Sequence, residues 1–552
     1  PKLDNSNNWH RFEAPAGSGL HSLGGASLFI GGIDGSNDGD SLHYAGTAYV
    51  GHGTDFWSGP ISGIYNKQYD MKWGRLWSLS KADIIFHKDH FGDVGYEPIE
   101  NIINWPGNGN EENGQAGQLA PYFDINENGV YEPMQGDYPL IRGDKAVYFI
   151  YNDDRAEHSG SGGRKLGVEI HGMAYGYNAP ADSALWNTLF MHYDLFNRSD
   201  TTYYDTYIGN YANIEIGYPF NDFVRCDVQR GAFIGYNGTN YDSDYGGGFD
   251  PGPYPGYHGD LPALAVTILG GPYMDGDGED NPYGGCDESI NGVDFGNGII
   301  DDERYGLTGF VHYWNNGGPS GNPNLAKEYY NYLKGLWLND SIILYGEISY
   351  GVFGAVGPGC KFTFPGDSDS CNWGTGGVEP GGGYNQNNLF WTEEEHSYPP
   401  DDRRGIGISG PFTFMPGDKQ EMDIAYIFAR NYADDDPLEL VAERIDQIRQ
   451  KVLNDSILLL PDILGEKRTV FNHHQIMIFP NPISNNILHV KPDFVIGEIY
   501  YSITNVSGVL VQKGFLDTNV DRVIDLKNLV SGIYILQLRY GNEIQYGKFI
   551  KR

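Results

Sequence analysis

The sequence predicts a mostly β protein. A glycine- and aromatic-rich β body with long loops and one late helix is followed by a small antiparallel β-sandwich of the immunoglobulin-like type. The 78 glycines and 30 prolines separate short runs of aromatic and β-branched residues, such as 146–151 and 341–345, a pattern typical of strands joined by loops. The 41 Tyr, 27 Phe and 10 Trp provide the buried area of a folded chain rather than a disordered one. At 552 residues the chain is long enough for at least two cores.

The body is expected to span residues 1–455, either as one unit or as two subdomains that meet near residue 215, and to end in a helix. From Pro437 to Leu453 the apolar residues fall on one face at helical spacing. Three aspartates precede this segment, where negative charge favours the N-terminus of a helix. We expect the helix to pack on the β body and residues 456–474 to form a connector.

Residues 475–552 form the predicted sandwich. Tyr534, Leu536 and Leu538 alternate with polar residues, which is the period of a half-buried strand. About seven such strands fit in this stretch, enough for a small antiparallel sandwich.

Four short motifs mark this C-terminal segment: Phe-Pro-Asn-Pro at 479–482, Val-Ser-Gly at 530–532, Gly-Ile-Tyr at 532–534 and Lys-Phe-Ile-Lys at 548–551. Their order resembles the type A C-terminal sorting domain of the type IX secretion system of Bacteroidota. The resemblance implies a cargo protein that the translocon and its shuttle export across the outer membrane, to the cell surface or the medium. It also implies a cleaved signal peptide upstream of Pro1, and it attaches no activity to the body.

The body carries further short motifs, many of which contain Pro or Trp, at residues 54–60, 104–106, 119–121, 136–139, 402–404 and 409–413. Together they resemble a family of large uncharacterised secreted proteins of Bacteroidota. No function is attached to that family, so this resemblance implies none for the body.

Composition excludes two classes of partner. Lys and Arg number 36 against 73 Asp and Glu, which gives a formal net charge of −37. A field of that sign repels nucleic acid phosphates and anionic lipid, whereas it suits divalent cations, which prefer oxygen ligands. No run of residues approaches the roughly 20 apolar positions of a membrane helix, so we expect no transmembrane segment.

The first candidate calcium site has oxygen side chains at alternate positions followed by a glycine, as in the first half of an EF-hand loop. Position twelve of such a loop, where a bidentate Glu is needed, is Gln135, so the segment is no true EF-hand. The alternative is a solvated turn rich in Asx residues. The expected ligands are Asp124, Asn126, Asn128, the Val130 carbonyl and Asp137.

The second candidate calcium site is an acidic cluster whose alternate carboxylates would repel one another unless a cation or solvent screens them. Asn297 and Gly298, which lead to Asp301, resemble the tail of another calcium loop, although the register is ambiguous. The alternative is a flexible acidic loop. The expected ligands are Asp275, Asp277, Glu279 and Asp301.

Enzyme signatures are thin, and we expect the body to work without a catalytic centre. The sequence has no nucleophile elbow, zinc-binding helix, Walker loop or Rossmann fingerprint. His87 and His90 could form a metal or acid–base group, but exposed polar residues are the favoured interpretation. Residues 393–395, three glutamates, could supply paired glycosidase carboxylates, although a solvated charge run is favoured.

The four cysteines are Cys226, Cys286, Cys360 and Cys371. They contain no C-x-x-C pair, which argues against a zinc knuckle or a thioredoxin-type redox site. In an exported protein we expect two disulfides. Cys360 with Cys371 is the best local pair, although all three pairings remain open.

These observations favour a calcium-stabilised cell-surface or extracellular protein that acts by contact, in adhesion, in a matrix or in filament-like assembly. Its partner would be a carbohydrate, a protein or further copies of itself. The Tyr-rich segment 241–257 is a candidate contact loop, and the alternative is a loop folded back on its own rings. Two competing functions stay open: a secreted hydrolase acting on polysaccharide or protein, and an accessory component of the secretion or gliding apparatus.

Overall fold

The computed structural model divides the chain into two compact units, Pro1–Asp462 and Ile463–Arg552, and each is described here by itself. The connector expected at 456–474 lies outside the described residues. The described residues are 12–36, 41–46, 53–244, 255–286, 291–315, 317–347, 349–351, 357–381, 390–396, 398–432, 436–455, 477–479, 483, 486–491, 499–505, 510–516, 523–540 and 543–552.

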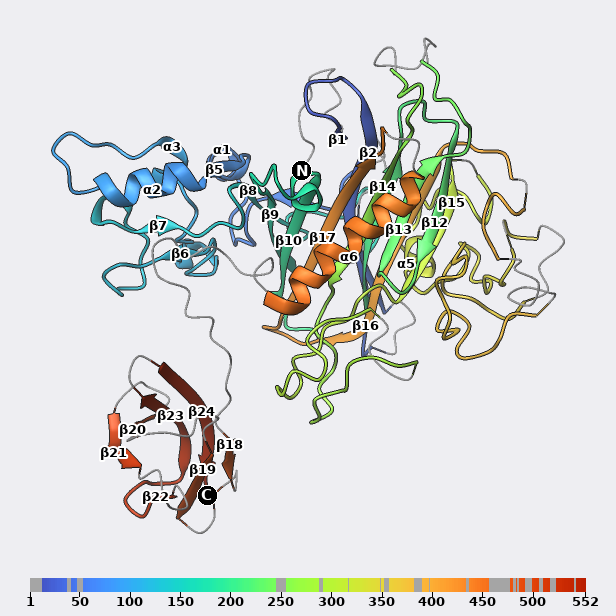
Figure 1. Ribbon diagram of the computed structural model, residues 1–552. Helices are drawn as coiled ribbons and strands as arrows, with labels where there is room; N and C mark the ends of the chain where they lie inside the picture. The colour runs from blue at the N-terminus through green and yellow to red at the C-terminus, as the bar shows by residue number, and fades with distance from the viewer. Residues whose placement is uncertain are drawn as a thin grey trace. The chain divides into compact units, whose positions relative to one another are not determined.

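The first unit is built on two antiparallel sheets (Figure 1). In the six-stranded sheet the order is β1-β2-β11-β16-β15, and β3 pairs with β2 beside this path. Both sheets combine strands from before and after residue 215, so the described strands join the two halves of the body. The strands of this sheet are β1 (Phe12–Glu13), β2 (His21–Asp34), β3 (Leu42–Gly46), β11 (Tyr203–Ile214), β15 (Gly309–Trp314) and β16 (Arg403–Phe414).

The nine-stranded sheet has the order β12-β13-β14-β17-β10-β9-β8-β4, and β5 pairs with β8. Its central strands β14 and β17 are almost entirely buried, as expected where both faces of a sheet are covered. The strands are β4 (Trp57–Ser58), β5 (Trp77–Ser80), β8 (Lys145–Asn152), β9 (Val168–Gly176), β10 (Thr188–Asn197), β12 (Asp222–Asp227), β13 (Ala232–Asn237), β14 (Pro262–Gly270) and β17 (Lys419–Arg430).

The main core lies between these two sheets. The Phe233 ring from one sheet stacks on Phe310 from the other, with ring centroids 4.9 Å apart. Across the same interior, the Tyr426 hydroxyl donates to Asn210 Oδ1 at 3.1 Å. A Cβ at Gly407 would lie 3.0 Å from the Phe233 ring, so a glycine at this position lets the ring enter. The mostly β class predicted from the sequence is confirmed.

Helices cover the outer faces of both sheets (Figure 1). The predicted late helix is α6 (Pro437–Asp455), which packs on β14 and β17. Its buried side chains Val441, Ile445, Ile448 and Val452 are the apolar face that the sequence spacing indicated. On the other sheet α5 (Ala326–Leu333) places the Tyr329 ring against Phe29 and Tyr44, and a single turn, α4 (Ser183–Trp186), precedes β10.

Between β4 and β8 the chain forms a small lobe, which is blue in Figure 1. Short capped helices dominate it, and the sequence interpretation did not find them because they are too short to show apolar periodicity. Ser80 and Asp83 nevertheless form a capping box at the start of α2. None of the helices in the described residues has the length and apolar character to cross a membrane. The lobe contains α1 (Lys67–Trp73), α2 (Lys81–His90), α3 (Glu100–Ile103), β6 (Tyr122–Phe123) and β7 (Tyr138–Pro139).

The second unit is a pair of small antiparallel sheets, as the alternation predicted. One has the order β18-β19-β22 and the other β21-β20-β23-β24. Tyr534, Leu536 and Leu538 of β23 enter its core with Phe549 of β24. The strands are β18 (Met477–Phe479), β19 (Ile487–Lys491), β20 (Ile499–Asn505), β21 (Leu510–Leu516), β22 (Val523–Asp525), β23 (Gly532–Tyr540) and β24 (Glu543–Lys551).

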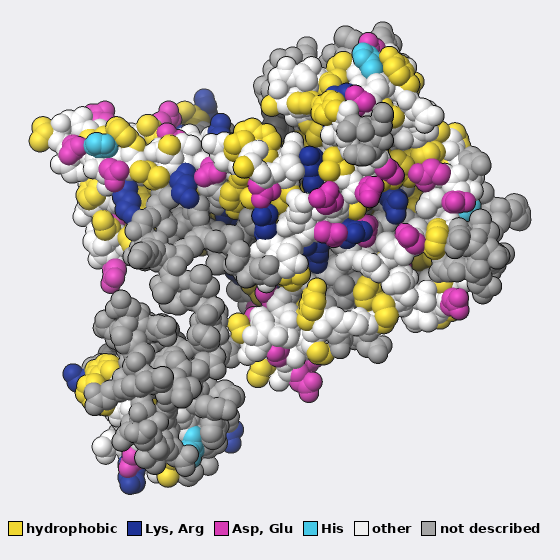
Figure 2. Space-filling model, viewed as in Figure 1, with side chains coloured by type: hydrophobic (Ala, Val, Ile, Leu, Met, Phe, Trp, Pro, Cys, Tyr) yellow, Lys and Arg dark blue, Asp and Glu magenta, His cyan; other side chains and the backbone are white. Residues whose placement is uncertain are grey.

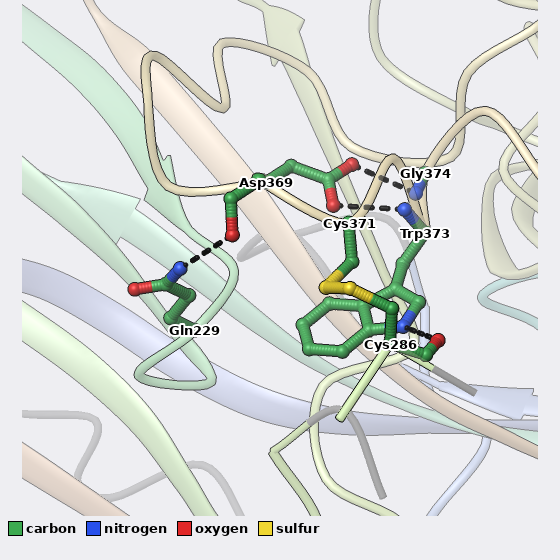
Figure 3. Close-up of a disulfide and its surroundings, with 7 residues drawn as sticks. Gln229, Cys286, Asp369, Cys371, Trp373 and Gly374 are labelled. Atoms are coloured by element: carbon green, nitrogen blue, oxygen red, sulfur yellow. Dashed lines mark hydrogen bonds between the residues drawn. A yellow bond between two sulfur atoms is a disulfide. The ribbon is translucent and has the colours of Figure 1, made fainter. Parts of the chain in front are cut away.

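The disulfide joins Cys286 to Cys371 (Figure 3), so the expected local pair of Cys360 with Cys371 is wrong. The Asp369 carboxylate fixes the turn that follows Cys371. Its two oxygens accept hydrogen bonds from the backbone N–H groups of Trp373 and Gly374, at 2.8 and 2.9 Å. The indole of Trp373 then donates to the Cys286 carbonyl at 2.7 Å. Cys360 and Cys226 are buried free thiols, so the structure has one disulfide among the described residues instead of two.

Candidate functional site

Loop A, residues 124–137, is the first predicted calcium site, and its own hydrogen bonds wind it tightly. Asp124 Oδ2 accepts from the N–H of the loop glycine at 2.6 Å. Asn126 Oδ1 accepts from the Asn128 N–H at 3.1 Å, and Asn128 Oδ1 from the Val130 N–H at 2.8 Å. The side chains at alternate positions therefore bond the backbone of the loop itself, which is compatible both with the predicted calcium loop and with the alternative of an Asx-rich turn.

Asp137 ties the two ends of loop A together from a fully buried position. One carboxylate oxygen accepts from the Ile125 N–H at 3.0 Å and the other from the Glu132 N–H at 2.6 Å. The Asp137 carbonyl accepts from His87 Nε2 of α2 at 3.0 Å. Asp137 therefore supports the loop from behind, with both carboxylate oxygens already engaged by backbone N–H groups.

One oxygen of loop A has no donor. Asp124 Oδ1 is buried and without a hydrogen-bond partner, a state that costs free energy unless a cation or water satisfies it. Glu132 lies close by, and its two oxygens accept from the Asn128 amide and the Gln135 amide, each at 2.6 Å. This arrangement of carboxylate and amide oxygens can hold a hard divalent cation.

Loop B, residues 275–303, contains the second predicted site, and its hydrogen bonds link three of the expected ligands, whereas the fourth, Asp275, bonds to β16. Asp275 accepts from the backbone N–H and the hydroxyl of Thr413 on β16, both at 2.7 Å, and is thereby drawn out of the cluster. Asp301 Oδ1 accepts from the N–H groups of Asp277 and the next glycine, each at 2.8 Å. Asp277 Oδ1 in turn accepts from the Glu279 N–H at 2.9 Å.

Two further carboxylates of loop B were not among the predicted ligands. Asp280 and Asp302 each use one oxygen on a donor of the loop, at 2.8 and 3.0 Å, while the Oδ1 of each is buried without a partner. Burial, together with Asp294, Glu303 and Asp280, raises the pKa of Asp302 to about 6. The sequence signal for Asp302 was its place next to Asp301. Which of the two would face the predicted calcium site could not be decided without the fold.

A charge strip crosses β10 and β17 on the outer face of the nine-stranded sheet. Because these strands pair with Asp194 opposite Glu421 and His192 opposite Asp423, four polar side chains meet there. Within the described parts of the chain, His192, Asp194 and Glu421 form the one group of three His, Cys, Asp or Glu ligands whose donor atoms lie within 4.8 Å of one another. The sequence interpretation missed it, since β10 and β17 lie more than 200 residues apart.

Cations of the protein itself already fill the charge strip. Lys419 Nζ lies 3.1 Å from Asp194 Oδ1 and also contacts Glu421. Arg304 Nη2 lies 2.9 Å from Asp423 Oδ2, and the Arg142 guanidinium lies 3.1 Å from His192. The three carboxylates are thus paired with Lys419 and Arg304, and Arg142 contacts His192, so the strip is best described as an ion-pair network of the protein's own side chains.

The strip perturbs the ionisation of its members in a consistent way. Burial alone would raise the pKa of Asp423, but His192 and Arg304 outweigh it and hold that pKa well below its usual range. Burial and Arg142 would lower the pKa of His192, but Asp423 and Asp194 outweigh them and raise it. The network therefore favours the charged forms of Asp423 and His192.

The two histidines weighed for chemistry do not converge. His87 is buried, with its ring nitrogens on the Tyr96 hydroxyl at 3.1 Å and the Asp137 carbonyl, and burial lowers the pKa of His87. His90 is instead paired with Asp93 at 2.7 Å. The first histidine positions loop A, and the second lies at the surface of α2.

The three glutamates weighed as glycosidase carboxylates are also separated. Glu393 is fully buried, where Oε1 lies 2.8 Å from Arg403 Nε and Oε2 accepts from the Val224 N–H at 2.6 Å. Burial raises the pKa of Glu393 to about 7. Glu394 and Glu395 are exposed. Glu393 is therefore a buried structural residue, and the three glutamates do not form a pair of carboxylates that face each other.

The described ends of the Tyr-rich segment 241–257 fold back on the body. Asp242 is fully buried and accepts the Tyr257 N–H, and the Tyr257 hydroxyl donates to the Ala14 carbonyl at 2.6 Å. Tyr241 stays 56% exposed and stacks on His258. Residues 245–254 lie outside the described part.

The C-terminal unit shows how the protein is exported. Its Lys551 is buried and donates to the carbonyls of Leu526 and Leu529, so the terminal motif closes the sandwich. Residues 477–552 match the family model of the secretion system C-terminal sorting domain. The chain is a cargo of the type IX secretion system.

This type IX cargo is exported across the outer membrane to the cell surface or the extracellular space, and its sorting domain interacts with the secretion machinery. A comparison with curated proteins gives no match for any part of the chain. The function of the body has to be argued from its own residues.

Proposed function

We propose that the body of this type IX cargo is a calcium-stabilised protein that acts by contact outside the cell, in adhesion, in a matrix or in filament-like assembly. The observation that carries this proposal is the apolar surface of the lobe between β4 and β8. Monomeric soluble proteins expose few large apolar side chains in one region, and larger groups of them mark contact surfaces.

The lobe concentrates such side chains. Eleven of the thirty exposed large hydrophobic residues in the described part of the chain fall between residues 64 and 134, and Figure 2 shows hydrophobic side chains on its visible face. They are Ile64, Met71, Leu76, Ile85, Phe86, Val94, Ile99, Ile103, Ile125, Val130 and Met134.

Calcium is the proposed support of this surface, because loop A belongs to the lobe. Three of the exposed residues, Ile125, Val130 and Met134, lie within loop A itself. A cation on Asp124 Oδ1, Asn126, Asn128 and the Val130 carbonyl would fix the conformation in which these side chains are presented. The partnerless carboxylate oxygens of Asp124, Asp280 and Asp302 support a cation in both loops.

The contact function is better supported than hydrolysis. Of the groups weighed for catalysis, His87 and Glu393 are buried in structural hydrogen bonds and the other three lie at the surface, whereas catalysis needs groups that converge on one reacting atom. An accessory role in the secretion or gliding apparatus would use the same surface, and it differs only in the identity of the partner.

The experiment compares two surface variants of the purified full chain. The double variant Phe86→Asp with Val94→Asp changes exposed residues of the lobe, and the control Ile342→Asp with Tyr432→Asp changes equally exposed residues elsewhere. We expect the lobe variant alone to lose self-association and binding to immobilised polysaccharide and protein. Equal binding by the two variants would contradict a contact role for the lobe.

A further inference from the structure

An open cleft of about 520 Å³ lies between β4, the end of α1 and the loop that follows β8. Its volume is within the range of small-ligand pockets. Aromatic side chains and short hydroxyl side chains share its wall, which is lined by Thr54, Phe56, Trp57, Asp70, Arg155 and Ser159.

The wall of the cleft is rigid. Trp57 pairs with Asn152 in the sheet, which fixes the backbone that carries the indole. Thr54 and Ser159 exchange hydrogen bonds, since the Thr54 N–H donates to Ser159 Oγ and the Ser159 N–H to the Thr54 carbonyl, both at 3.1 Å. A Cβ at Gly53 would lie 2.3 Å from the Ser159 carbonyl oxygen, so only glycine allows this close approach.

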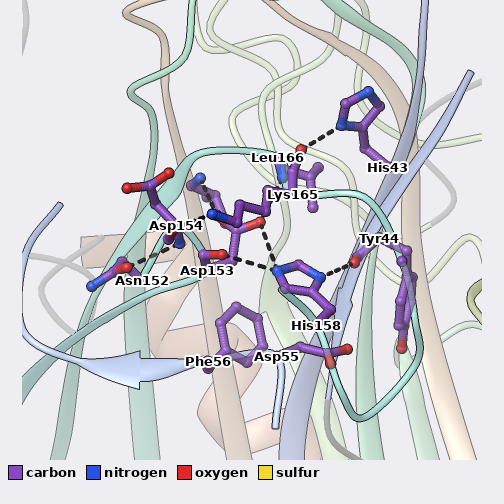
Figure 4. A network of polar contacts seen from close by, with 12 residues as sticks. His43, Tyr44, Asp55, Phe56, Asn152, Asp153, Asp154, His158, Lys165 and Leu166 are labelled. Atoms are coloured by element: carbon purple, nitrogen blue, oxygen red, sulfur yellow. Dashed lines mark hydrogen bonds and ion pairs between the residues drawn. The ribbon is translucent and has the colours of Figure 1, made fainter. Parts of the chain in front are cut away.

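A polar network stands behind the cleft (Figure 4). The two ring nitrogens of His158 face the carbonyl oxygens of Tyr44 and Asp153 at 2.8 and 2.9 Å. Carbonyl oxygens only accept, so both bonds form together when the ring is cationic, and the buried Asp153 carboxylate lies 3.6 Å away. The Trp57 ring packs against this histidine, with centroids 6.1 Å apart. The site is therefore preorganised, which lowers the entropy cost of binding.

The charges at the mouth of the cleft cancel. Arg155 binds Asp70 through both terminal nitrogens, with Nη2 3.0 Å from Oδ2, and this contact holds the pKa of Asp70 below its usual range. The guanidinium has five N–H donors and the carboxylate about four acceptor sites. After the Arg155–Asp70 contact has formed, each group therefore still has free hydrogen-bonding positions. An anion near Arg155 would be repelled by the Asp70 carboxylate, whereas a hydroxyl, which donates and accepts, can bond both partners.

We propose that the Trp57 cleft binds a neutral carbohydrate. A sugar ring offers an apolar C–H face that suits the electron-rich face of an indole, and a hydroxyl edge that suits the Arg155–Asp70 pair. Thr54 Oγ1, whose proton is donated to the Phe56 carbonyl at 2.7 Å, can serve as a further acceptor. The inference rests on the proposed contact function and names the class of ligand that this part of the body takes.

The test is titration calorimetry of the full chain with cellohexaose, maltohexaose, xylohexaose and N-acetylchitohexaose. Hexagalacturonate represents anionic sugars, and an apolar hexapeptide represents protein ligands. We expect at least one neutral oligosaccharide to bind, and Trp57→Ala to weaken it at least tenfold. The control is Trp186→Ala, which removes an indole that is 52% exposed on another element and should leave Kd unchanged.

A second variant keeps the test independent of folding defects. Asp70→Asn changes a side chain that is 47% exposed and removes the carboxylate partner of Arg155. We expect this variant to bind neutral sugars more weakly and to gain binding of hexagalacturonate. Binding of only the peptide or the anionic sugar by the unmodified chain, or unchanged affinity in Trp57→Ala, would overturn the proposal. If adhesion persists in Trp57→Ala without sugar binding, the cleft proposal fails and the contact function stands. If the unmodified chain binds no surface at all, the contact function fails.

Discussion

Several buried carboxylates in this protein lie beside a cation. Glu393 is paired with Arg403, and Asp423 of the charge strip is paired with Arg304. Removing one partner of such a pair costs about 3–5 kcal/mol, since the other charge stays buried. In the acidic loops, one carboxylate oxygen each of Asp124, Asp280 and Asp302 is buried without a hydrogen-bond partner, and burial with neighbouring carboxylates raises the pKa of Asp302 to about 6.

Asp302→Asn tests whether loop B holds a cation. Without calcium, the change relieves repulsion between Asp302 and its acidic neighbours, so we expect the unfolding midpoint in EGTA to rise. With calcium, the loop loses a ligand, so the calcium-induced rise should shrink. For comparison, a cation at 100 times its Kd stabilises the folded state by about 2.7 kcal/mol. Differential scanning calorimetry with and without calcium gives both quantities.

Asp124→Asn is the matching change in loop A, and there we expect a smaller calcium-induced rise. The control is Asp367→Asn, which removes a carboxylate that is 70% exposed outside both loops and should change neither quantity. Midpoints that are the same in calcium and in EGTA for the unmodified chain would show that both loops are turns without a cation.

The charge strip predicts how stability depends on pH. The pKa of His192 is raised above 6.5, so its stabilising contribution is complete below that value and is lost as the pH rises through the pKa of the folded state. The pKa of Asp423 is lowered, so its contribution is complete above 3.8 and is lost only in stronger acid. Asp194, Glu421, Lys419, Arg142 and Arg304 complete the surroundings of these groups.

We therefore expect the difference in unfolding midpoint between the unmodified chain and His192→Gln to be largest near pH 5–6 and to shrink toward pH 9. Thermal unfolding followed by circular dichroism across this range measures it. His90→Gln, a change at the surface of α2, serves as the control and should show no such trend. A difference that stays constant with pH would mean that His192 contributes only packing.

At the scale of elements, the sequence predicted the helices and strands that have a local periodic pattern. It did not predict contacts between residues that are far apart in the sequence. The spacing in α6 and the alternation in β23 are local, and both are confirmed. The charge strip and the Cys286–Cys371 disulfide join residues 231 and 85 positions apart, and no local pattern records such pairs. The expected ligands of loop A follow one another along the chain and could therefore be proposed from the sequence, whereas Asp280 and Asp302 of loop B come together only after folding.

The packing of α6 is tested by Ile445→Ala. This side chain is fully buried between the helix and the sheet, and such a truncation costs about 2–5 kcal/mol. Leu453→Ala, at a position of the same helix that is 41% exposed, should cost less than about 0.5 kcal/mol. Chemical denaturation of the full chain measures both. Equal effects would mean that α6 is not docked through its predicted apolar face.

At the scale of the whole molecule, a C-terminal sorting domain that directs export is combined with a body for which we propose a contact function. The two-sheet sandwich leaves its outer faces to helices, loops and the lobe (Figure 1). Those outer parts carry the acidic loops, the exposed apolar residues and the Trp57 cleft. The central claim is therefore that the exported body binds its target without changing it.

The most direct test incubates the purified full chain with immobilised polysaccharides and proteins, and measures retained protein and released product in the same wells. We predict retention that EGTA reverses and no product above the level without protein. Product that accumulates with time, and that disappears in Glu393→Gln or His87→Gln, would contradict the account and identify the body as a hydrolase.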